Sequence, residues 1–140
     1  MSGVAMNRPL FPKVHRGDIS YVDFGNQPGS AVHGIRPAMV VQNEVGNRHA
    51  PTIIVAAITT EIKKTRQPTH VLLGAQFGLP QESMLMLEQL TTIDKVMLQR
   101  YIGTAEEGFM KTVDRALSIS VGVRPNRFPK RRLRNTPKGR

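Results

Sequence analysis

The side chains best suited to chemistry in this chain lie at the ends of apolar segments. Arg36 stands between Gly34 and Pro37, where the glycine lets a ligand approach the backbone and the proline confines Arg36 to an extended conformation. Thr59 and Thr60 end a long apolar run. A guanidinium and a hydroxyl that meet at one edge of a sheet would suit a phosphate group.

Two further polar groups follow apolar segments in the same way. The cations Lys63, Lys64 and Arg66 come soon after the threonines, and Glu88 and Gln89 follow a later apolar run. A carboxylate and an amide can read the edges of nucleic-acid bases. Each signal also has an ordinary structural explanation, because turns favour Gly and Pro, strands favour Thr, and basic loops are commonly just solvated.

The positive charge is concentrated at the two ends of the chain. The 140 residues include 20 Lys or Arg and 10 Asp or Glu, which gives a net charge of +10. Residues 1–16 carry three basic groups and residues 124–140 carry eight, and neither segment has an acidic residue. The body between them is nearly neutral, so the net charge predicts a partner for the tail and says little about the body.

The composition excludes several kinds of chemistry. The chain has no Cys, which rules out disulfides, Cys-ligated metals and thiol nucleophiles. His15, His49 and His70 lack metal-ligand spacing and are interpreted as structural, so we expect no metal and no cofactor. The apolar run Ile53–Ile58 is far shorter than the roughly 20 residues of a membrane span, and residues 1–12 lack a secretory signal. We therefore expect a cytoplasmic protein with no membrane partner.

Strand-like segments fill the first two thirds of the chain. The pattern predicts strands over residues 19–24, 38–42, 52–59, 69–73 and 83–87, with residues 90–93 as a candidate sixth. The unbroken apolar centre of residues 52–59 indicates the central strand, buried on both faces. Residues 43–48 are expected to form a turn, and Pro37 is expected only at the beginning of its strand.

One helix follows the strands. Thr104-Ala-Glu-Glu107 has the spacing of a capping box and is expected to open this helix. Its apolar face is predicted to contain Met110, Val113, Leu117 and Val121, to lie on the sheet, and to end near Gly122.

The chain is predicted to form one domain. We expect it to span residues 13–123, after a flexible N-terminal arm of residues 1–12. Residues 124–140 combine three prolines with dense like charge, which predicts a disordered basic tail.

Several short motifs occur together and in order along the domain. They are His15-Arg-Gly-Asp18, Gly29-Ser30, Gly34-Ile-Arg-Pro37, Val41-Gln-Asn43, Gly46-Asn-Arg48, Ile54-Val-Ala-Ala-Ile-Thr59, Pro68-Thr-His-Val71 and Leu87-Glu-Gln89. As a set they resemble the MazF/PemK family of toxin endoribonucleases, most closely its Gram-positive branch. The resemblance extends from about Lys13 to Ser120.

The resemblance implies a fold, an activity and a set of partners. The fold is mainly β (α+β), a small antiparallel barrel-like sheet of the plasmid-maintenance-toxin type with a C-terminal helix, and it forms a homodimer. The activity is metal-independent, sequence-specific cleavage of single-stranded RNA or mRNA, which arrests growth and is held in check by a cognate antitoxin protein.

The resemblance also assigns site residues. Arg36 and Thr59 correspond to the catalytic pair of the family, and Ser30, Glu88 and Gln89 correspond to positions that bind substrate. Their neighbours in the motif and in the basic segment are expected to bind RNA as well: Gly34, Thr60, Lys63 and Lys64.

RNA can be cut without a metal because its own 2′-hydroxyl can attack the adjacent phosphate. The products are a 2′,3′-cyclic phosphate and a 5′-hydroxyl end. Arg36, with Thr59 donating a hydrogen bond, would stabilise the negative charge of the transition state. Because arginine stays protonated, Arg36 suits a clamp or an acid better than a base.

The chain departs from the family directly after its Gly-Ser pair. Many relatives carry an acidic residue there, whereas this chain has Ala31, followed by Val32 and His33. Either another group is the base, or the rate is lower, or His33 takes the role, although an isolated loop histidine is commonly only solvated. Thr91, where a relative places a basic residue, indicates an altered target preference.

Two rival functions remain open at this point. Ala31 is compatible with a catalytically weak RNA-binding module, and a gyrase-poison-type inhibitor shares this kind of barrel. The motif from Gly34 to Pro37 together with Thr59 argues for the ribonuclease. The basic tail is expected to attract RNA without sequence preference and in a salt-dependent way, or to contact an acidic antitoxin segment.

Overall fold

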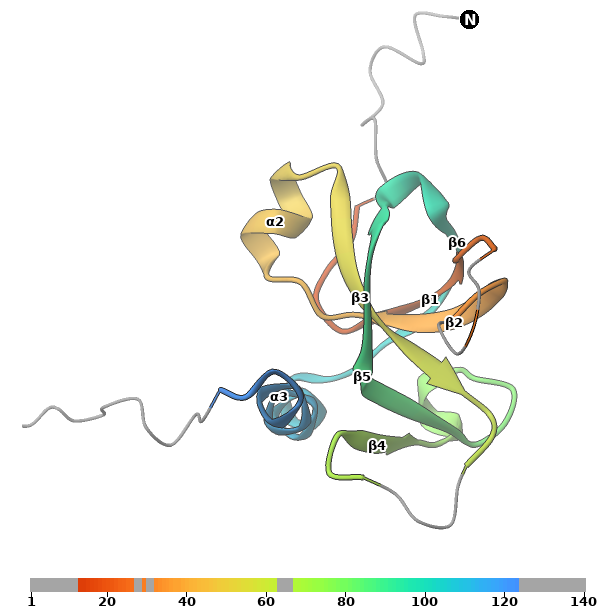
Figure 1. Ribbon diagram of the computed structural model, residues 1–140, viewed down its shortest axis with the longest axis vertical. Coiled ribbons are helices and arrows are strands. Elements are labelled where there is room, and N and C mark those ends of the chain that lie inside the picture. The colour runs from red at the N-terminus through yellow and green to blue at the C-terminus, as the bar shows by residue number, and fades with distance from the viewer. Residues whose placement is uncertain (1–12, 27–28, 30–31, 63–66, 124–140) are drawn as a thin grey trace, which may run out of the picture.

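The computed structural model describes residues 13–26, 29, 32–62 and 67–123, so the expected arm and tail lie outside the described residues (Figure 1). A single sheet contains all six described strands in the order β4-β5-β3-β2-β1-β6, and every neighbouring pair is antiparallel. The sheet curls into a half-barrel beside a C-terminal helix, which confirms the expected fold class. Its elements are β1 (Asp18–Asp23), β2 (Ile35–Val40), α2 (Glu44–His49), β3 (Thr52–Thr59), β4 (His70–Leu73), η1 (Ala75–Phe77), β5 (Ser83–Asp94), η2 (Lys95–Met97), β6 (Leu98–Thr104) and α3 (Glu107–Val121).

The strand β3 occupies the centre of the sheet, as its apolar sequence predicts. It pairs with β2 on one side and with β5 on the other. The prediction of burial on both faces is wrong for Ile54. Its side chain points to the same face of β3 as those of Ala56 and Ile58. Those two belong to the core against α3, whereas Ile54 lies beyond that core and is 36% exposed.

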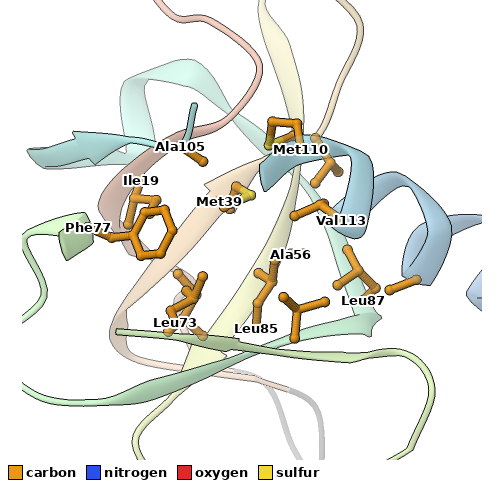
Figure 2. Close-up of a cluster of buried hydrophobic side chains, with 14 of the residues drawn as sticks. Ile19, Met39, Ala56, Leu73, Phe77, Leu85, Leu87, Ala105, Met110 and Val113 are labelled. Carbon is orange, nitrogen blue, oxygen red and sulfur yellow. The ribbon is translucent and has the colours of Figure 1, made fainter. Parts of the chain in front are cut away.

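Two hydrophobic clusters cover opposite faces of the sheet because neighbouring side chains of a strand point to opposite sides. Met39 lies in the cluster between the sheet and α3 (Figure 2), while its neighbours Ala38 and Val40 lie in the other. The larger cluster contains Ile19, Ala56, Leu73, Phe77, Leu85, Leu87, Met110 and Val113 among others. The smaller one contains Val14, Val22, Phe24, Ile53, Val55 and Ile93.

The segment predicted as a turn at residues 43–48 is instead the helix α2. Asn43 caps it, because the side-chain oxygen of Asn43 accepts a hydrogen bond from the Gly46 amide at 2.8 Å. Gly46 and two asparagines give this segment low helix propensity, so the sequence pattern favoured a turn. The cap and the burial of Asn47 stabilise the helix in the folded chain.

The strand β5 continues from Ser83 to Asp94, so the predicted strand end at Leu87 and the separate strand at 90–93 are wrong. Its pairing with β3 is irregular in the middle, because Ala57 pairs with Met86 whereas Ala56 pairs with Leu90. Residues 87–89 therefore bulge out of the ladder. Bulges interrupt alternation and bend a strand, which explains why the sequence pattern looked like a strand end.

The edge strand β6 escaped the sequence reasoning. Its side chains are exposed or half-buried throughout, so it lacks an apolar alternation. Pro37 is the third residue of β2 and not its first, and it is tolerated there because pairing of β2 with β3 begins only at Ala38.

The predicted helix start is also wrong. Thr104 ends β6 and donates its hydroxyl to Asp18 Oδ1 at 2.7 Å, and α3 begins at Glu107. The buried face of α3 consists of Met110, Val113 and Ala116, while Val121 is 56% exposed. Gly122 ends the helix with a φ of 78°, as expected. Of the helices in the described part of the chain, none has the length and apolar character needed to cross a membrane.

Candidate active site

A cleft of about 390 Å³ opens where β2, β3, β4 and β5 come together. Its walls come from these four strands, from Gly29, Val32 and His33 in the β1–β2 loop, and from Glu61 and Gln67 in the β3–β4 connection. Five of the residues singled out from the sequence line it together: His33, Arg36, Thr59, Glu88 and Gln89.

Strand register brings Arg36 and Thr59 together. Ala38 of β2 pairs with Ala57 of β3, Met39 with Ala56 and Val40 with Val55. Continuing this antiparallel register by two residues places Arg36 opposite Thr59, on the same face of the sheet. Both side chains line the cleft, so two residues 23 positions apart in the sequence face one space.

The Arg36 side chain is exposed and is held by its own loop. Its Nε donates a hydrogen bond to the His33 carbonyl oxygen at 2.9 Å. This bond uses the inner nitrogen of the guanidinium and leaves the two terminal nitrogens for a phosphate, which binds well to such a planar fork.

The Thr59 hydroxyl is oriented by the backbone that follows it. Its oxygen accepts a hydrogen bond from the Glu61 amide at 3.1 Å. Because one lone pair of the oxygen is occupied by this amide, the hydroxyl hydrogen can point away from it and toward the cleft. Thr59 can therefore act as a hydrogen-bond donor to a substrate oxygen.

The bulge in β5 brings two adjacent polar side chains into the cleft. Met84, Met86 and Glu88 alternate along β5 and all line the cleft, as the two-residue period of a strand requires. In a regular strand Gln89 would face the other side. Since residues 87–89 leave the ladder, Glu88 and Gln89 both reach the cleft.

Glu88 is held by two neighbours from β4 and the turn before it. Thr69 Oγ1 donates to Glu88 Oε1 at 2.8 Å, and His70 Nε2 lies 2.9 Å from Glu88 Oε2. Partial burial raises the pKa of Glu88, but the hydrogen bonds from His70 and Thr69 outweigh burial and lower the pKa below its usual value. The cleft therefore contains a carboxylate that stays ionised in weak acid.

The remaining predicted site residues lie elsewhere or outside the described chain. Gly34 and Thr60 do not line the cleft. Gly34 has a φ of 77°, and a Cβ there would meet nothing within 4 Å, so this position needs glycine for backbone conformation and not for close approach. Ser30, Lys63 and Lys64 lie outside the described residues.

Three polar residues of the cleft were missed from the sequence: Glu61, Gln67 and His70. His70 was interpreted as structural, yet it lines the cleft and contacts Glu88. The antiparallel pairing of β4 with β5 causes this contact, because it sets His70 opposite Met86, which is two residues from Glu88 along β5. Recognising residues 69–73 and 83–87 as partners could have revealed it.

The cleft combines a guanidinium, a hydroxyl donor, an ionised carboxylate and an amide. The first two are suited to a phosphodiester and the last two to a base edge. No group of three or more His, Asp or Glu able to hold a metal ion occurs within residues 13–26, 29, 32–62 and 67–123. The fold and the cleft together define a small β protein whose cleft is chemically suited to a phosphodiester beside a base.

Comparison with known proteins agrees with this class. The family model of the PemK-like, MazF-like toxins of type II toxin-antitoxin systems matches residues 15–121. Endoribonuclease EndoA of Bacillus subtilis (strain 168) is 44% identical over 111 residues, which cover 79% of this chain and 96% of EndoA. The chain belongs to the PemK/MazF toxin family, as its sequence motifs indicated.

Solved structures share the fold at lower identity. An endoribonuclease from a mycobacterial species matches with a TM-score of 0.68 and 22% identity, covering 86% of this chain and all of that one. MazF from Deinococcus radiodurans matches with a TM-score of 0.68 and 20% identity, covering 82% of this chain and 100% of its own. A mycobacterial endoribonuclease in complex with its cognate antitoxin matches with a TM-score of 0.67 and 24% identity, covering 83% of this chain and 99% of its own.

Proposed function

We propose that this chain is the toxin of a type II toxin-antitoxin pair and a metal-independent endoribonuclease that cuts single-stranded RNA at a short sequence. The observation that carries the proposal is the convergence of Arg36 and Thr59 on one cleft from neighbouring strands. Family membership and the 44% identity to an endoribonuclease support the activity.

The proposed reaction uses the nucleophile that RNA itself carries. The 2′-oxygen attacks the adjacent phosphorus as the bond from phosphorus to the 5′-oxygen breaks, which leaves a 2′,3′-cyclic phosphate and a 5′-hydroxyl end. The 2′-hydroxyl loses its proton and the leaving 5′-oxygen gains one. The terminal nitrogens of Arg36 and the hydroxyl of Thr59 would stabilise the charge on the phosphate oxygens.

We assign the proton transfer from the 2′-hydroxyl to His33 as a hypothesis. His33 lines the cleft, and its carbonyl is tied to the Arg36 side chain at 2.9 Å, so the histidine and the guanidinium belong to one local structure. Replacing His33 by Ala should reduce cleavage and change its dependence on pH between 5 and 8. Unchanged cleavage across this range would eliminate His33 as the base.

Partners follow from the same proposal. Structures of related toxins with their antitoxins support a protein antitoxin as a partner. We further propose that the chain acts as a homodimer in the cytoplasm and that single-stranded RNA occupies the cleft together with flanking surface.

The experiment is cleavage of a long mixed-sequence RNA in the presence of a metal chelator, with the cut positions mapped and the new ends analysed. We expect cuts at one short sequence that leave cyclic phosphate and 5′-hydroxyl ends. A single 2′-deoxy nucleotide on the 5′ side of the cut should abolish cleavage and preserve binding, because it removes only the nucleophile.

Two results would contradict the proposal. Binding of RNA with no cutting under any condition would favour a catalytically inactive binding module. Absence of any effect on RNA, together with growth arrest that depends on a topoisomerase, would favour an inhibitor of the gyrase-poison type.

A further inference from the structure

His70 is the most enclosed titratable side chain of the cleft, with 5% of that side chain exposed. Its Nδ1 accepts a hydrogen bond from the Gln67 amide at 3.2 Å. A ring nitrogen that accepts a hydrogen bond from an amide carries no hydrogen, so the ring hydrogen of neutral His70 lies on Nε2. The fold thereby fixes one of the two tautomers.

The acceptor next to the Nε2 hydrogen is the Glu88 carboxylate. Nε2 lies 2.9 Å from Glu88 Oε2, and Thr69 Oγ1 donates to the other oxygen, Oε1, at 2.8 Å. Each oxygen of the carboxylate is thus hydrogen-bonded, by two residues that are adjacent in the sequence. The Thr69 carbonyl also accepts a hydrogen bond from the Leu87 amide at 2.9 Å. This bond attaches Thr69 and His70 to the bulge of β5.

We propose that His70 is a positioning residue that, as the Nε2–H tautomer, orients the Glu88 carboxylate to accept N–H groups from a nucleobase in the cleft. The inference rests on the proposed function in that it takes RNA as the ligand. An ionised carboxylate offers about four lone-pair sites. His70 and Thr69 occupy two, and the backbone amide of Glu88 itself also contacts the carboxylate, which leaves room for a base.

The chemistry of the carboxylate defines the kind of base. A carboxylate without a hydrogen accepts and cannot donate, so it favours an edge with an exocyclic amino group and disfavours one with a carbonyl. Cytosine and uracil differ in this way at position 4, where cytosine carries the amino group. The cleft should therefore prefer cytosine to uracil, or another amino-bearing edge to its carbonyl counterpart, at the position that Glu88 contacts.

A purely structural role for His70 makes a different prediction. The His70 amide donates to the Gln67 carbonyl at 3.0 Å, so the ring could serve only to close the turn of residues 67–70 through Nδ1. In that case the contact with Glu88 would not matter for RNA.

Two substitutions separate these roles. In His70→Gln the side-chain amide lies where Nε2 was, so it can still donate to Glu88 but cannot accept from the Gln67 amide. In His70→Asn the side chain ends where Nδ1 was, so it can accept from the Gln67 amide but cannot reach Glu88. The two variants each remove one of the two hydrogen bonds.

The measurement is the Kd of the full chain for a target RNA made uncleavable by a 2′-deoxy nucleotide, with the cleavable RNA used for kcat and KM. We expect His70→Asn to weaken binding about tenfold and raise KM with little change in kcat, because an interaction that positions a base contact acts on substrate and transition state alike. His70→Gln should restore most of the affinity. His70→Asn should also reduce the preference for the amino-bearing base.

A double mutant shows whether His70 acts through Glu88. In the background of Glu88→Gln, we expect His70→Asn to cause no further loss of affinity. Thermal unfolding of each variant identifies any that fails to fold. Nitrogen NMR of the His70 ring in the unaltered chain gives a readout that needs neither RNA nor a variant, and it should show the hydrogen on Nε2.

Several results would overturn the inference. They are a hydrogen on Nδ1 in the NMR spectrum, weaker binding for His70→Gln than for His70→Asn, or additive losses in the double mutant. Tight binding without cleavage would refute the proposed function alone, because the Kd values would still test His70. A chain that binds no RNA would refute both.

Discussion

The two ends of strand β3 each carry a group of polar residues, and the two groups differ in burial and in hydrogen bonding. Helix α2 lies beside the beginning of β3 (Figure 1), where polar side chains hydrogen-bond to one another. At the end of β3 the polar residues line the cleft. The eight residues of β3 span seven steps from Thr52 to Thr59, which corresponds to about 23 Å.

The group under α2 is buried and hydrogen-bonded within the fold. Asn47 and Lys95 are each 3% exposed. Gln42 Nε2 donates to Asn47 Oδ1 at 3.2 Å and to the Thr52 carbonyl at 3.0 Å, and Asn47 Nδ2 donates back to the Gln42 carbonyl at 3.0 Å. Lys95 Nζ donates to the Asn47 carbonyl. Asn47 Nδ2 also donates to Glu44 Oε1 at 3.1 Å. Together these hydrogen bonds fix the helix to the sheet.

The group in the cleft is only partly used by the protein. Arg36 is exposed and Thr59 is half-buried, and each makes one hydrogen bond within its own loop. Glu88 is held at both oxygens and still keeps one third of its side chain exposed. The difference teaches that residue type and motif alone do not separate a structural polar group from a functional one, whereas burial and unused hydrogen-bonding capacity do.

The largest expected effect is at Thr59. Thr59→Val keeps the shape and the strand propensity of the side chain and removes the hydroxyl, so we expect kcat to fall about 100- to 1000-fold. Thermal unfolding should stay close to that of the unaltered chain, because Thr59 is not fully buried. Thr59→Ser retains the donor and should keep most of the activity. Full cleavage by Thr59→Val would show that Thr59, like the polar residues under α2, serves only the fold.

A second prediction concerns the buried group under α2. Asn47→Ala removes an amide that both donates and accepts, and we expect the free energy of unfolding to fall by about 2 kcal/mol in urea titrations. The kcat/KM per folded molecule should not change, since Asn47 lies far from the cleft. A loss of cleavage without a loss of stability would contradict the division between the two groups.

A smaller effect is expected at the cap of α2. Asn43→Ala removes the side-chain acceptor of the Gly46 amide and should cost about 1 kcal/mol in unfolding free energy. Asn43→Asp keeps an acceptor at the same place and should cost much less. Equal losses for the two variants would show that the cap is not what stabilises α2.

The smallest expected effect is on the pH dependence of the free energy of unfolding. One carboxylate from each region tests it. The pKa of Glu44 is lowered: burial raises it, but hydrogen bonds from Asn47 and the Arg16 amide and the charges of His15 and Arg48 outweigh burial. The pKa of Glu88 is lowered in the corresponding way by His70 and Thr69.

A lowered pKa in the folded state means that the ionised carboxylate stabilises the fold above its unfolded pKa. This contribution is complete above the unfolded pKa of about 4.3 and is lost as the pH falls below that value and through the lower folded pKa. We therefore expect Glu44→Gln and Glu88→Gln each to flatten the fall of unfolding free energy in this range. Only Glu88→Gln should also weaken RNA binding at neutral pH. Weaker binding by both variants would extend the RNA surface to α2.

The sequence predicted the parts of the fold that depend on local patterns. Strands at residues 52–59 and near residues 19–24 and 69–73 were correct within one or two residues, because their apolar side chains alternate or run unbroken. The helix α2 and the edge strand β6 were missed. Their stability comes from a cap, from buried polar partners and from pairing with β1, none of which leaves an apolar period in the sequence.

The candidate site divides in the same way. Arg36 stood out from the sequence because it precedes an apolar segment beside a proline that restricts its backbone, and Thr59 stood out because it ends one. His70 did not, because its importance depends on Gln67 and Glu88, which approach it only when β4 pairs with β5. A single histidine in a sequence does not reveal which nitrogen carries its hydrogen.

The amino-acid sequence by itself determined the family, the central strand and the chemical groups that are present. The tertiary structure decided which of those groups face one another: register placed Arg36 opposite Thr59, and the bulge in β5 turned both Glu88 and Gln89 into the cleft. The physical reason is that side-chain periodicity is a local property of the chain, whereas register and bulges are settled between strands distant in sequence, by the packing of the whole sheet.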